Sequence, residues 1–296
     1  MTAEVIPFNG SVLSAAASEL GEGPTFDPHT GKAWWFNIVG SELHELDTAS
    51  GETQVHPLPF MGSVLARIDT GRQLIATDKG LFIRDTVSGE FSPYLELEAD
   101  KPGNRSNDGR VHQSGALWIG TMGRKAEDGA GAIYHVAKGT VTRLFDRISI
   151  TNAICFSPDG ATGYFVDTKI NQLMQVALDA RTGLPTGEPS VLIDNNGKPG
   201  GMDGAVCDGE GKIWNARWGA GVVDSYAPDG TLLARYEVPA KQPSCPAFFG
   251  KDADRLLVTS AWQGMDAAAR KSDPKAGNLI DLGISVKGRF EPDYLL

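Results

Sequence analysis

Four polar residues that share one sequence context carry most of the chemistry this chain offers. Each precedes a short apolar segment, a glycine-centred turn and a second segment rich in aromatic residues. The turn glycine comes nine residues after Glu22 and eight residues after the other three, in the pairs Asn107–Gly115, Asn152–Gly160 and Asp203–Gly211. Two carboxylates and two carboxamides form a set of hard oxygen donors. Such a set suits Ca²⁺, Mg²⁺ or Mn²⁺, and some Zn²⁺ or Fe²⁺ sites.

Arg105 adds a cationic group two residues before Asn107. At that spacing the guanidinium is expected at the same rim, where it could hold an anionic or carbonyl oxygen. If three of the four oxygen-bearing residues bind an ion, positions remain open for water and substrate. An open coordination sphere is typical of a catalytic site rather than a closed structural one.

The context of these residues recurs along the chain as a repeat of 40 to 50 residues. The repeats start at Gly21, Met61, Arg105, Thr151, Gly201 and Pro243. Within each repeat, alternating segments rich in Val, Tyr, Phe and Thr predict four strands, and Asp-Gly, Ser-Gly and Lys-Gly pairs predict the hairpin turns between them. Six units of four strands indicate an all-β fold, a six-bladed β-propeller with four-stranded blades around a central channel.

A propeller would bring the four polar residues together. The first strand of each blade lines the central channel, and each polar residue stands near the start of such a strand. The side chains of Glu22, Asn107, Asn152 and Asp203 should therefore converge at one mouth of the channel. Asp and Asn are also common in turns between blades, and that explanation fits any one of them alone. The turn explanation is much weaker for all four residues together, because four oxygen-bearing residues occupy the same position of their repeats.

The repeats leave the last blade incomplete, since the sixth unit has no clear fourth strand. We expect residues 1–296 to form a single propeller domain in which a strand from residues 2 to 18 completes that blade and removes an open edge.

Composition excludes several classes of protein. The formal net charge is −10, and no basic cluster is longer than Arg124-Lys125, which argues against nucleic acid as a partner. No apolar run approaches the roughly 18 residues of a membrane span. The first 20 residues lack the basic flank of a signal peptide. Three cysteines without a CxxC pair fit a reducing compartment. We expect a cytoplasmic protein, as a monomer or small homo-oligomer, acting on a small molecule.

The repeat motifs resemble those of a known family. "LGEGPTFD", "NRSNDGRVHQSGALWIGTM", "ITNAICFSPDGATGYFVDT" and "MDGAVCDGEGKIWNARWG" look like successive blade motifs of the senescence marker protein/gluconolactonase family, which includes regucalcin and bacterial sugar lactonases. The resemblance runs from about residue 18 to the C-terminus. It implies a six-bladed propeller that opens sugar lactones, such as glucono-, galactono- or pentonolactones, to aldonic acids.

The resemblance also implies roles for individual residues. Glu22, Asn152 and Asp203 would hold one divalent cation, whether Ca, Mg, Mn, Zn or Fe. Arg105 and Asn107 would contact the substrate, and Asp203 would activate the attacking water. Because a carboxylate bound to an ion is a weak base, a path through other carboxylates also remains open.

One stretch departs from the family pattern. Family members often offer an acidic residue to the sugar after the "GTM" motif, whereas Gly123-Arg124-Lys125 is basic here. We therefore add Lys125 to the substrate-binding residues and expect that the substrate could be an acidic lactone. The five histidines fit surface or turn positions, with no HExxH spacing.

An alternative function uses the same ring of oxygen ligands. A calcium-binding or scaffold propeller could hold Ca²⁺ without any chemistry. Arg105 beside an incomplete coordination sphere favours the enzyme, because a storage site does not need a group that clamps substrate.

Overall fold

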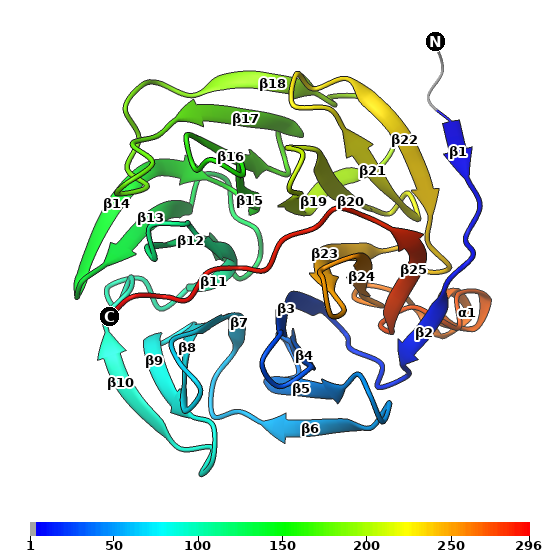
Figure 1. Cartoon of the computed structure of the whole chain (residues 1–296), viewed down its shortest axis with the longest axis horizontal. Coiled ribbons are helices and arrows are strands. Elements are labelled where there is room, and N and C mark those ends of the chain that lie inside the picture. The colour runs from blue at the N-terminus through cyan, green and yellow to red at the C-terminus, as the bar shows by residue number, and fades with distance from the viewer. Residues whose placement is uncertain (1–3) are drawn as a thin grey trace.

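Six β-sheets stand side by side around a central axis in this computed structural model, which describes residues 4–296 (Figure 1). Blades one and two consist of β3 (Gly21–Asp27), β4 (Lys32–Asn37), β5 (Glu42–Asp47), β6 (Thr53–Pro57), and β7 (Gly62–Arg67), β8 (Arg72–Thr77), β9 (Gly80–Asp85), β10 (Phe91–Leu95). Blades three and four consist of β11 (Asn104–Val111), β12 (Leu117–Gly123), β13 (Gly131–Ala137), β14 (Thr140–Ile148), and β15 (Thr151–Phe156), β16 (Thr162–Asp167), β17 (Gln172–Ala177), β18 (Ser190–Asp194). The predicted six-bladed all-β propeller is confirmed.

The N-terminal segment contributes to the last two blades. Blade five consists of β19 (Gly201–Cys207), β20 (Ile213–Trp218), β21 (Val222–Tyr226) and β22 (Leu232–Glu237), with β1 (Glu4–Ile6) as a fifth, parallel strand. Blade six consists of β23 (Pro243–Phe249), β24 (Arg255–Ser260), β25 (Leu279–Ser285) and β2 (Ser11–Ser14).

β2 pairs antiparallel with β25, so a strand from the start of the chain lies at the outer edge of the last blade. Of the segment 2–18 in which a strand was expected, residues 2 and 3 lie outside the described part. The strand β1, which extends blade five, was not expected from the sequence.

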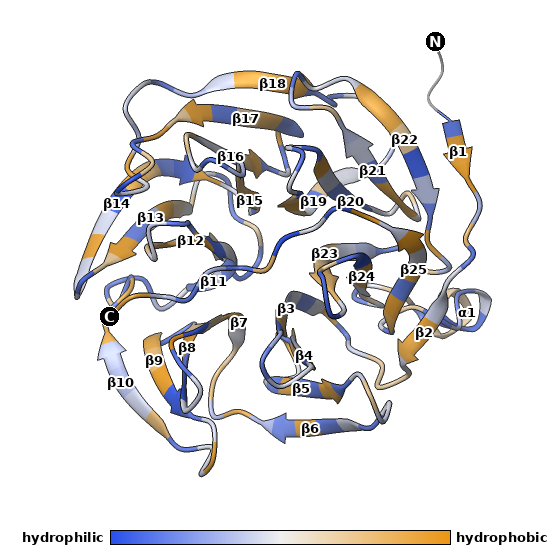
Figure 2. Cartoon of the chain, viewed as in Figure 1, coloured by the Kyte–Doolittle hydropathy of each residue, from blue (hydrophilic) through white to orange (hydrophobic). Residues whose placement is uncertain are grey.

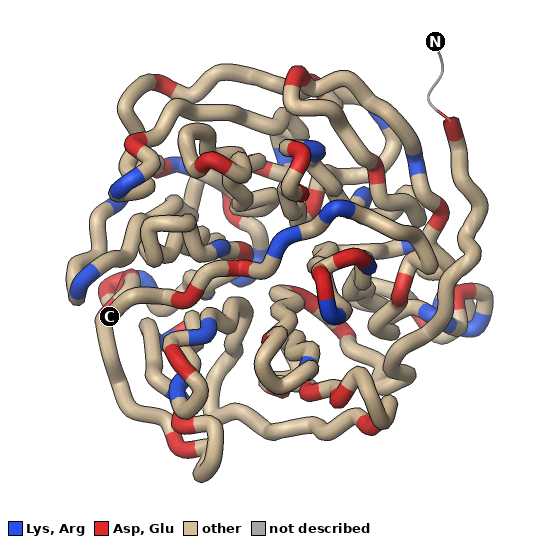
Figure 3. Tube along the Cα trace, viewed as in Figure 1, with Lys and Arg blue, Asp and Glu red and all other residues tan. Residues whose placement is uncertain are grey.

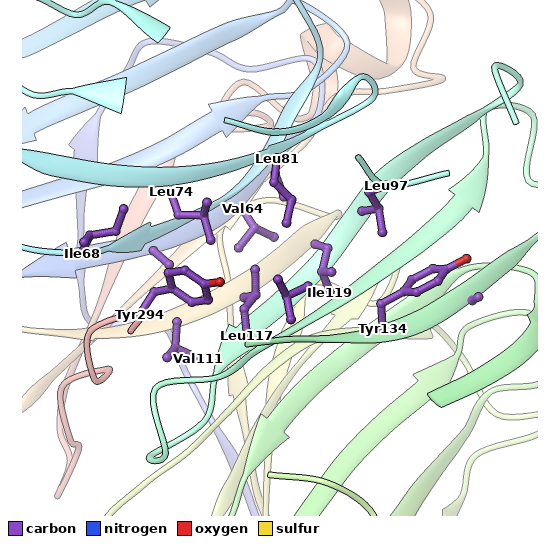
Figure 4. Close-up of a cluster of buried hydrophobic side chains, with 14 residues drawn as sticks. Val64, Ile68, Leu74, Leu81, Leu97, Val111, Leu117, Ile119, Tyr134 and Tyr294 are labelled. Carbon is purple, nitrogen blue, oxygen red and sulfur yellow. The ribbon is translucent and has the colours of Figure 1, made fainter. Parts of the chain in front are cut away.

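Hydrophobic side chains pack between neighbouring blades. Strands such as β8 and β16 are buried at consecutive positions, so both faces of a blade offer apolar residues to the neighbouring blades, and apolar residues occur on strands around the whole ring (Figure 2). Figure 4 shows one such cluster between blades two and three, in which Val64 and Leu74 meet Val111 and Leu117. The ring of packed blades gives the inner strands a rigid frame.

The C-terminal segment, residues 286–296, crosses the centre of the ring, and we call it the C-terminal strap (Figure 1). Arg289 Nε donates to the carbonyl oxygen of Cys207 at 3.0 Å, and the backbone N–H of Tyr294 donates to the carbonyl oxygen of Arg67 at 2.7 Å. Cys207 and Arg67 are the last residues of inner strands β19 and β7. The strap therefore covers the mouth of the channel opposite to the one where these strands begin.

Lys and Arg are spread over the blades together with Asp and Glu (Figure 3). Among residues 4–296 the single helix, α1 (Ala267–Ser272), has six residues and is far too short to cross a membrane.

Candidate active site

A cavity of about 270 Å³ opens at the mouth of the channel where the inner strands begin. Its lining includes every residue that the sequence singled out: Glu22, Arg105, Asn107, Lys125, Asn152 and Asp203. The other lining residues are Leu20, Met122, Arg124, Ala126, Ile150, Thr168, Trp218 and Gln263. Inner strands of four different blades thus bring their polar residues to one place.

β-Bulges place the polar side chains at the ends of these strands. The pairing of each first strand with its second strand shifts register just after or around the polar residue, between Glu22 and Thr25 in blade one and between Met202 and Ala205 in blade five. A bulge redirects the side chain and adds twist. Here it turns side chains into the channel mouth.

Two glycines allow the inner strands to approach closely at these bulges. Gly23 has a φ of +56°, and a Cβ there would lie 2.0 Å from the carbonyl oxygen of Ser63. A Cβ on Gly204 would lie 2.4 Å from Cys245 Sγ on the neighbouring blade. The Asp203-Gly204 pair therefore has two roles. The aspartate faces the cavity, and the glycine lets blades five and six pack closely.

A chain of hydrogen bonds holds the amide side chains. Asn107 Nδ2 donates to Asn152 Oδ1 at 2.9 Å and to the carbonyl oxygen of Thr151 at 2.8 Å. Asn152 Nδ2 in turn donates to Thr168 Oγ1 at 2.9 Å. The network orients both amides and links blades three and four. It leaves one lone pair of Asn152 Oδ1 for a further partner, because a carbonyl oxygen can accept twice.

The two carboxylates at the cavity are buried, with exposed fractions of 7% for Glu22 and 4% for Asp203. Burial, and then the charge of Asp108, raise the pKa of Glu22 from 4.5 to about 8; the N–H of Gly23, which donates to Oε2 at 3.1 Å, opposes this only in part. Burial and the charge of Glu22 raise the pKa of Asp203 well above its usual value. Both carboxyls therefore lack enough positive charge nearby to ionise readily.

This donor set fits a divalent cation. None of the ion pairs among residues 4–296 involves Glu22 or Asp203, and within that range no three His, Cys, Asp or Glu side chains cluster as metal ligands without the help of an amide. A cation at this mouth would therefore rest on the two carboxylates and an amide oxygen such as that of Asn152. Two buried carboxylates without a basic partner are costly, and a bound cation would offset that cost.

Arg105 lies at the same mouth of the channel, and two hydrogen bonds from Nη1 hold its guanidinium group. Its Nη1 donates to Asn107 Oδ1 at 2.6 Å and to the carbonyl oxygen of Ser106 at 2.9 Å. Burial lowers the pKa of Arg105 to about 10, although the charges of Glu22 and Asp203 favour its charged form. The guanidinium stays charged at neutral pH, and no hydrogen bond within residues 4–296 uses its Nη2.

One carboxylate next to the site was missed from the sequence. Asp108 is buried, and its oxygens accept from the backbone N–H groups of Gly109 at 2.8 Å and Ile154 at 2.7 Å. Burial raises the pKa of Asp108 to about 6. Its position directly after Asn107 in "SNDG" was the sequence feature that could have identified it as a residue near the site.

The placement of the histidines was partly wrong. His44, His112 and His135 are buried, and His112 Nε2 lies 2.9 Å from the carbonyl oxygen of Gly160. They pack and hydrogen-bond within or between blades, because a ring nitrogen can satisfy a backbone carbonyl where a purely apolar side chain could not. None of them lines the cavity.

The fold and the cavity define a class: a six-bladed propeller whose inner strands present two carboxylates, two amides and an arginine at one channel mouth. Residues 20–262 match the model of the SMP-30/Gluconolactonase/LRE-like region. The chain belongs to this family, as its motifs indicated.

Relatives with known names lie within the same family. The chain is 66% identical over 293 residues to a Rhizobium meliloti protein named "Putative sugar lactone lactonase", with 99% of each chain covered. It is 35% identical to an L-arabinolactonase from Azospirillum brasilense, over 91% of this chain and 90% of the relative. A crystal structure of a protein described as calcium-binding regucalcin from Agrobacterium tumefaciens superposes with a TM-score of 0.99 at 66% identity and covers both chains completely.

Proposed function

We propose that the protein is a divalent-metal-dependent lactonase that opens a sugar lactone to the aldonic acid. The observation that carries the proposal is the meeting of Glu22, Asn152 and Asp203 with Arg105 in one cavity. The similarity to the L-arabinolactonase over most of both chains supports a lactone as the substrate.

Each residue has a role that follows from its surroundings. Glu22, Asn152 and Asp203 hold the cation, which supplies Lewis-acid polarisation of the lactone carbonyl when bound. Arg105 donates from its free Nη2 to an oxygen of the lactone. Asn107 keeps Arg105 and Asn152 oriented through its amide, and its carbonyl oxygen has a second lone pair for a sugar hydroxyl.

Asp203 receives the proton in the hydrolytic step. The water oxygen forms a bond to the carbonyl carbon while its proton passes to the carboxylate of Asp203. The bond between that carbon and the ring oxygen then breaks, and the ring oxygen takes up the proton as it leaves. The products are a hydroxyl group and a carboxylic acid on one open chain. Besides Glu22, the buried Asp108 is a further carboxylate near Asp203.

The test is a screen of five- and six-membered aldonolactones, with proton release as the readout. Each lactone is offered to the chelator-treated protein alone and with Ca²⁺, Mg²⁺, Mn²⁺, Zn²⁺ or Fe²⁺. We expect hydrolysis of at least one lactone that depends on the added ion. The proposal is wrong if no lactone is turned over with any ion, or if turnover is the same after chelation.

A second candidate function is calcium binding without chemistry. It is favoured by the similarity to the structure described as a calcium-binding protein. In the same experiments, this function predicts tight Ca²⁺ binding by calorimetry and no hydrolysis of any lactone.

A further inference from the structure

The loop between β12 and β13 forms a cationic part of the cavity rim. Arg124 and Lys125 both line the cavity there. Hydrogen bonds hold the loop backbone, because the N–H of Arg124 donates to the carbonyl oxygen of Gly103 at 2.9 Å and the N–H of Lys125 donates to Glu127 Oε2 at 3.1 Å. The backbone of both cationic residues is thus fixed at the rim before any ligand binds.

The next residue in the loop is held in a strained conformation. Ala126 has a φ of +55°, a left-handed value that a residue with a Cβ adopts rarely. Such strain tends to be kept where the structure needs a particular side-chain position, and functional sites are the usual place. At Ala126 it accompanies the turn that presents Lys125 to the cavity.

The charges around the cavity become positive once a cation binds. The lining carries the three cations Arg105, Arg124 and Lys125 and the two carboxylates Glu22 and Asp203, and Arg124 is paired with Asp78. A divalent cation at the carboxylates would therefore leave a net positive charge there. This positive excess stands out in a protein whose formal net charge is −10. Since like charges gathered at a cavity repel, a ligand with a negative charge would be attracted to it.

The two rim cations differ in how much of their charge is already compensated. Arg124 forms an ion pair with Asp78, and its Nη1 lies 3.3 Å from Met61 Sδ. Lys125 is exposed, and none of the ion pairs within residues 4–296 uses its ammonium group. Lys125 is therefore the cation at the rim that is available to a ligand.

We propose that the substrate is a sugar lactone that carries a negatively charged group at the end of the sugar chain away from the lactone carbonyl, and that Lys125 binds this group. The inference rests on the proposed lactonase function and narrows its substrate class. A carboxylate and a phosphate ester share the required chemistry.

The arrangement gives the two ends of such a substrate separate partners. The carboxylates and Arg105 at the inner strands take the reacting end, and the rim loop takes the charged end. The cavity volume of about 270 Å³ lies just below the roughly 300–1,000 Å³ of small-molecule sites, which suits a single sugar unit. Lys is a compact point charge on a flexible stem, so it can follow an anion at an open rim.

The experiment compares kcat/KM for matched lactones that differ only at the terminal carbon: glucono-1,4-lactone, the corresponding glucarolactone with a carboxylate, and a 6-phosphogluconolactone. We expect an anionic lactone to be preferred by about tenfold or more, as one charge-assisted contact allows. Lys125→Met should remove most of that preference, because kcat/KM for the anionic lactone falls more than kcat/KM for the neutral lactone. Lys138→Met, on the exposed β13–β14 turn, is the matched control and should change neither value.

The outcomes separate this inference from the proposed function. Equal kcat/KM for neutral and anionic lactones, or a preference that survives in Lys125→Met, overturns the inference while lactonase activity stands. If no lactone is hydrolysed, the proposed function fails, and binding still decides the inference. Calorimetry should then show that the dicarboxylic aldarate binds more tightly than the aldonate, and that Lys125→Met abolishes the difference. Equal affinities would overturn the inference without any turnover.

Discussion

Replacing Glu22 with glutamine should stabilise the metal-free protein and weaken its response to metal. Gln has nearly the shape of Glu and keeps an oxygen that can accept from the N–H of Gly23, which now donates to Oε2 at 3.1 Å. It removes a buried negative charge whose pKa in the folded protein is raised from 4.5 to about 8. The two proteins should therefore differ in how their stability depends on pH.

The direction in which the free energy of unfolding changes with pH follows from proton binding. Between pH 4.5 and 8 the folded wild-type protein retains a proton on Glu22 that the unfolded chain has lost, so its stability falls as pH rises through this window. One proton corresponds to about 1.4 kcal/mol per pH unit. In chelator we expect the wild-type free energy of unfolding to fall by several kcal/mol between pH 5 and 8, and Glu22→Gln to lack that part of the slope.

Metal should reduce the difference in stability between the two proteins at pH 8. A cation at one hundred times its Kd adds about 2.7 kcal/mol to the folded protein. Wild type should gain this at pH 8, and Glu22→Gln should gain little. The assay is urea unfolding at pH 5 to 8.5, with chelator or with metal, and the exposed Glu52→Gln serves as the control. Equal pH slopes of wild type and Glu22→Gln in chelator, or unchanged metal affinity by calorimetry, would refute the reasoning.

Three further predictions address catalysis and closure of the ring. Asp203→Asn should fold normally, bind metal more weakly and lose lactone hydrolysis by at least about 100-fold at saturating metal; near-wild-type turnover would end its assignment as the base. Arg105→Ala should raise KM, with or without a fall in kcat, since Arg105 positions the substrate; a change in kcat alone would contradict that role. Deletion of the first 15 residues removes β1 and β2 and should abolish cooperative unfolding, so a truncated protein that melts like the intact one would refute the need for β2.

Much of the fold and the candidate site could be predicted from the sequence because the information is local. Alternating apolar residues and paired turn residues define each strand and hairpin through neighbours along the chain. Repetition of that pattern at 40 to 50 residues then indicates a propeller, whose geometry brings the starts of inner strands together. Glu22 and Asp203 are far apart in sequence, and they line one cavity because each begins an inner strand in the same phase.

Other features depend on contacts that no local pattern specifies. The burial that raises the pKa of Glu22 comes from neighbouring blades. Asp108 contributes only because the closed ring brings the start of β11 near β3, two blades away. Two of the buried histidines were misplaced for the same reason, since the carbonyl oxygens that His112 and His135 contact belong to Gly160 and Thr182 of blade four.

The two ends of the chain show most clearly which features the sequence determines and which depend on the tertiary structure. The sequence by itself determined six repeating units, the polar residue at the start of four inner strands, and the lack of a fourth strand in the last unit. Only the tertiary structure decided that β2 lies beside β25, that β1 extends blade five, and that Tyr294 of the C-terminal strap packs between blades two and three (Figure 4). These pairings join residues from opposite ends of the chain, and their stability depends on the surfaces that meet when the ring closes rather than on the pattern within either segment.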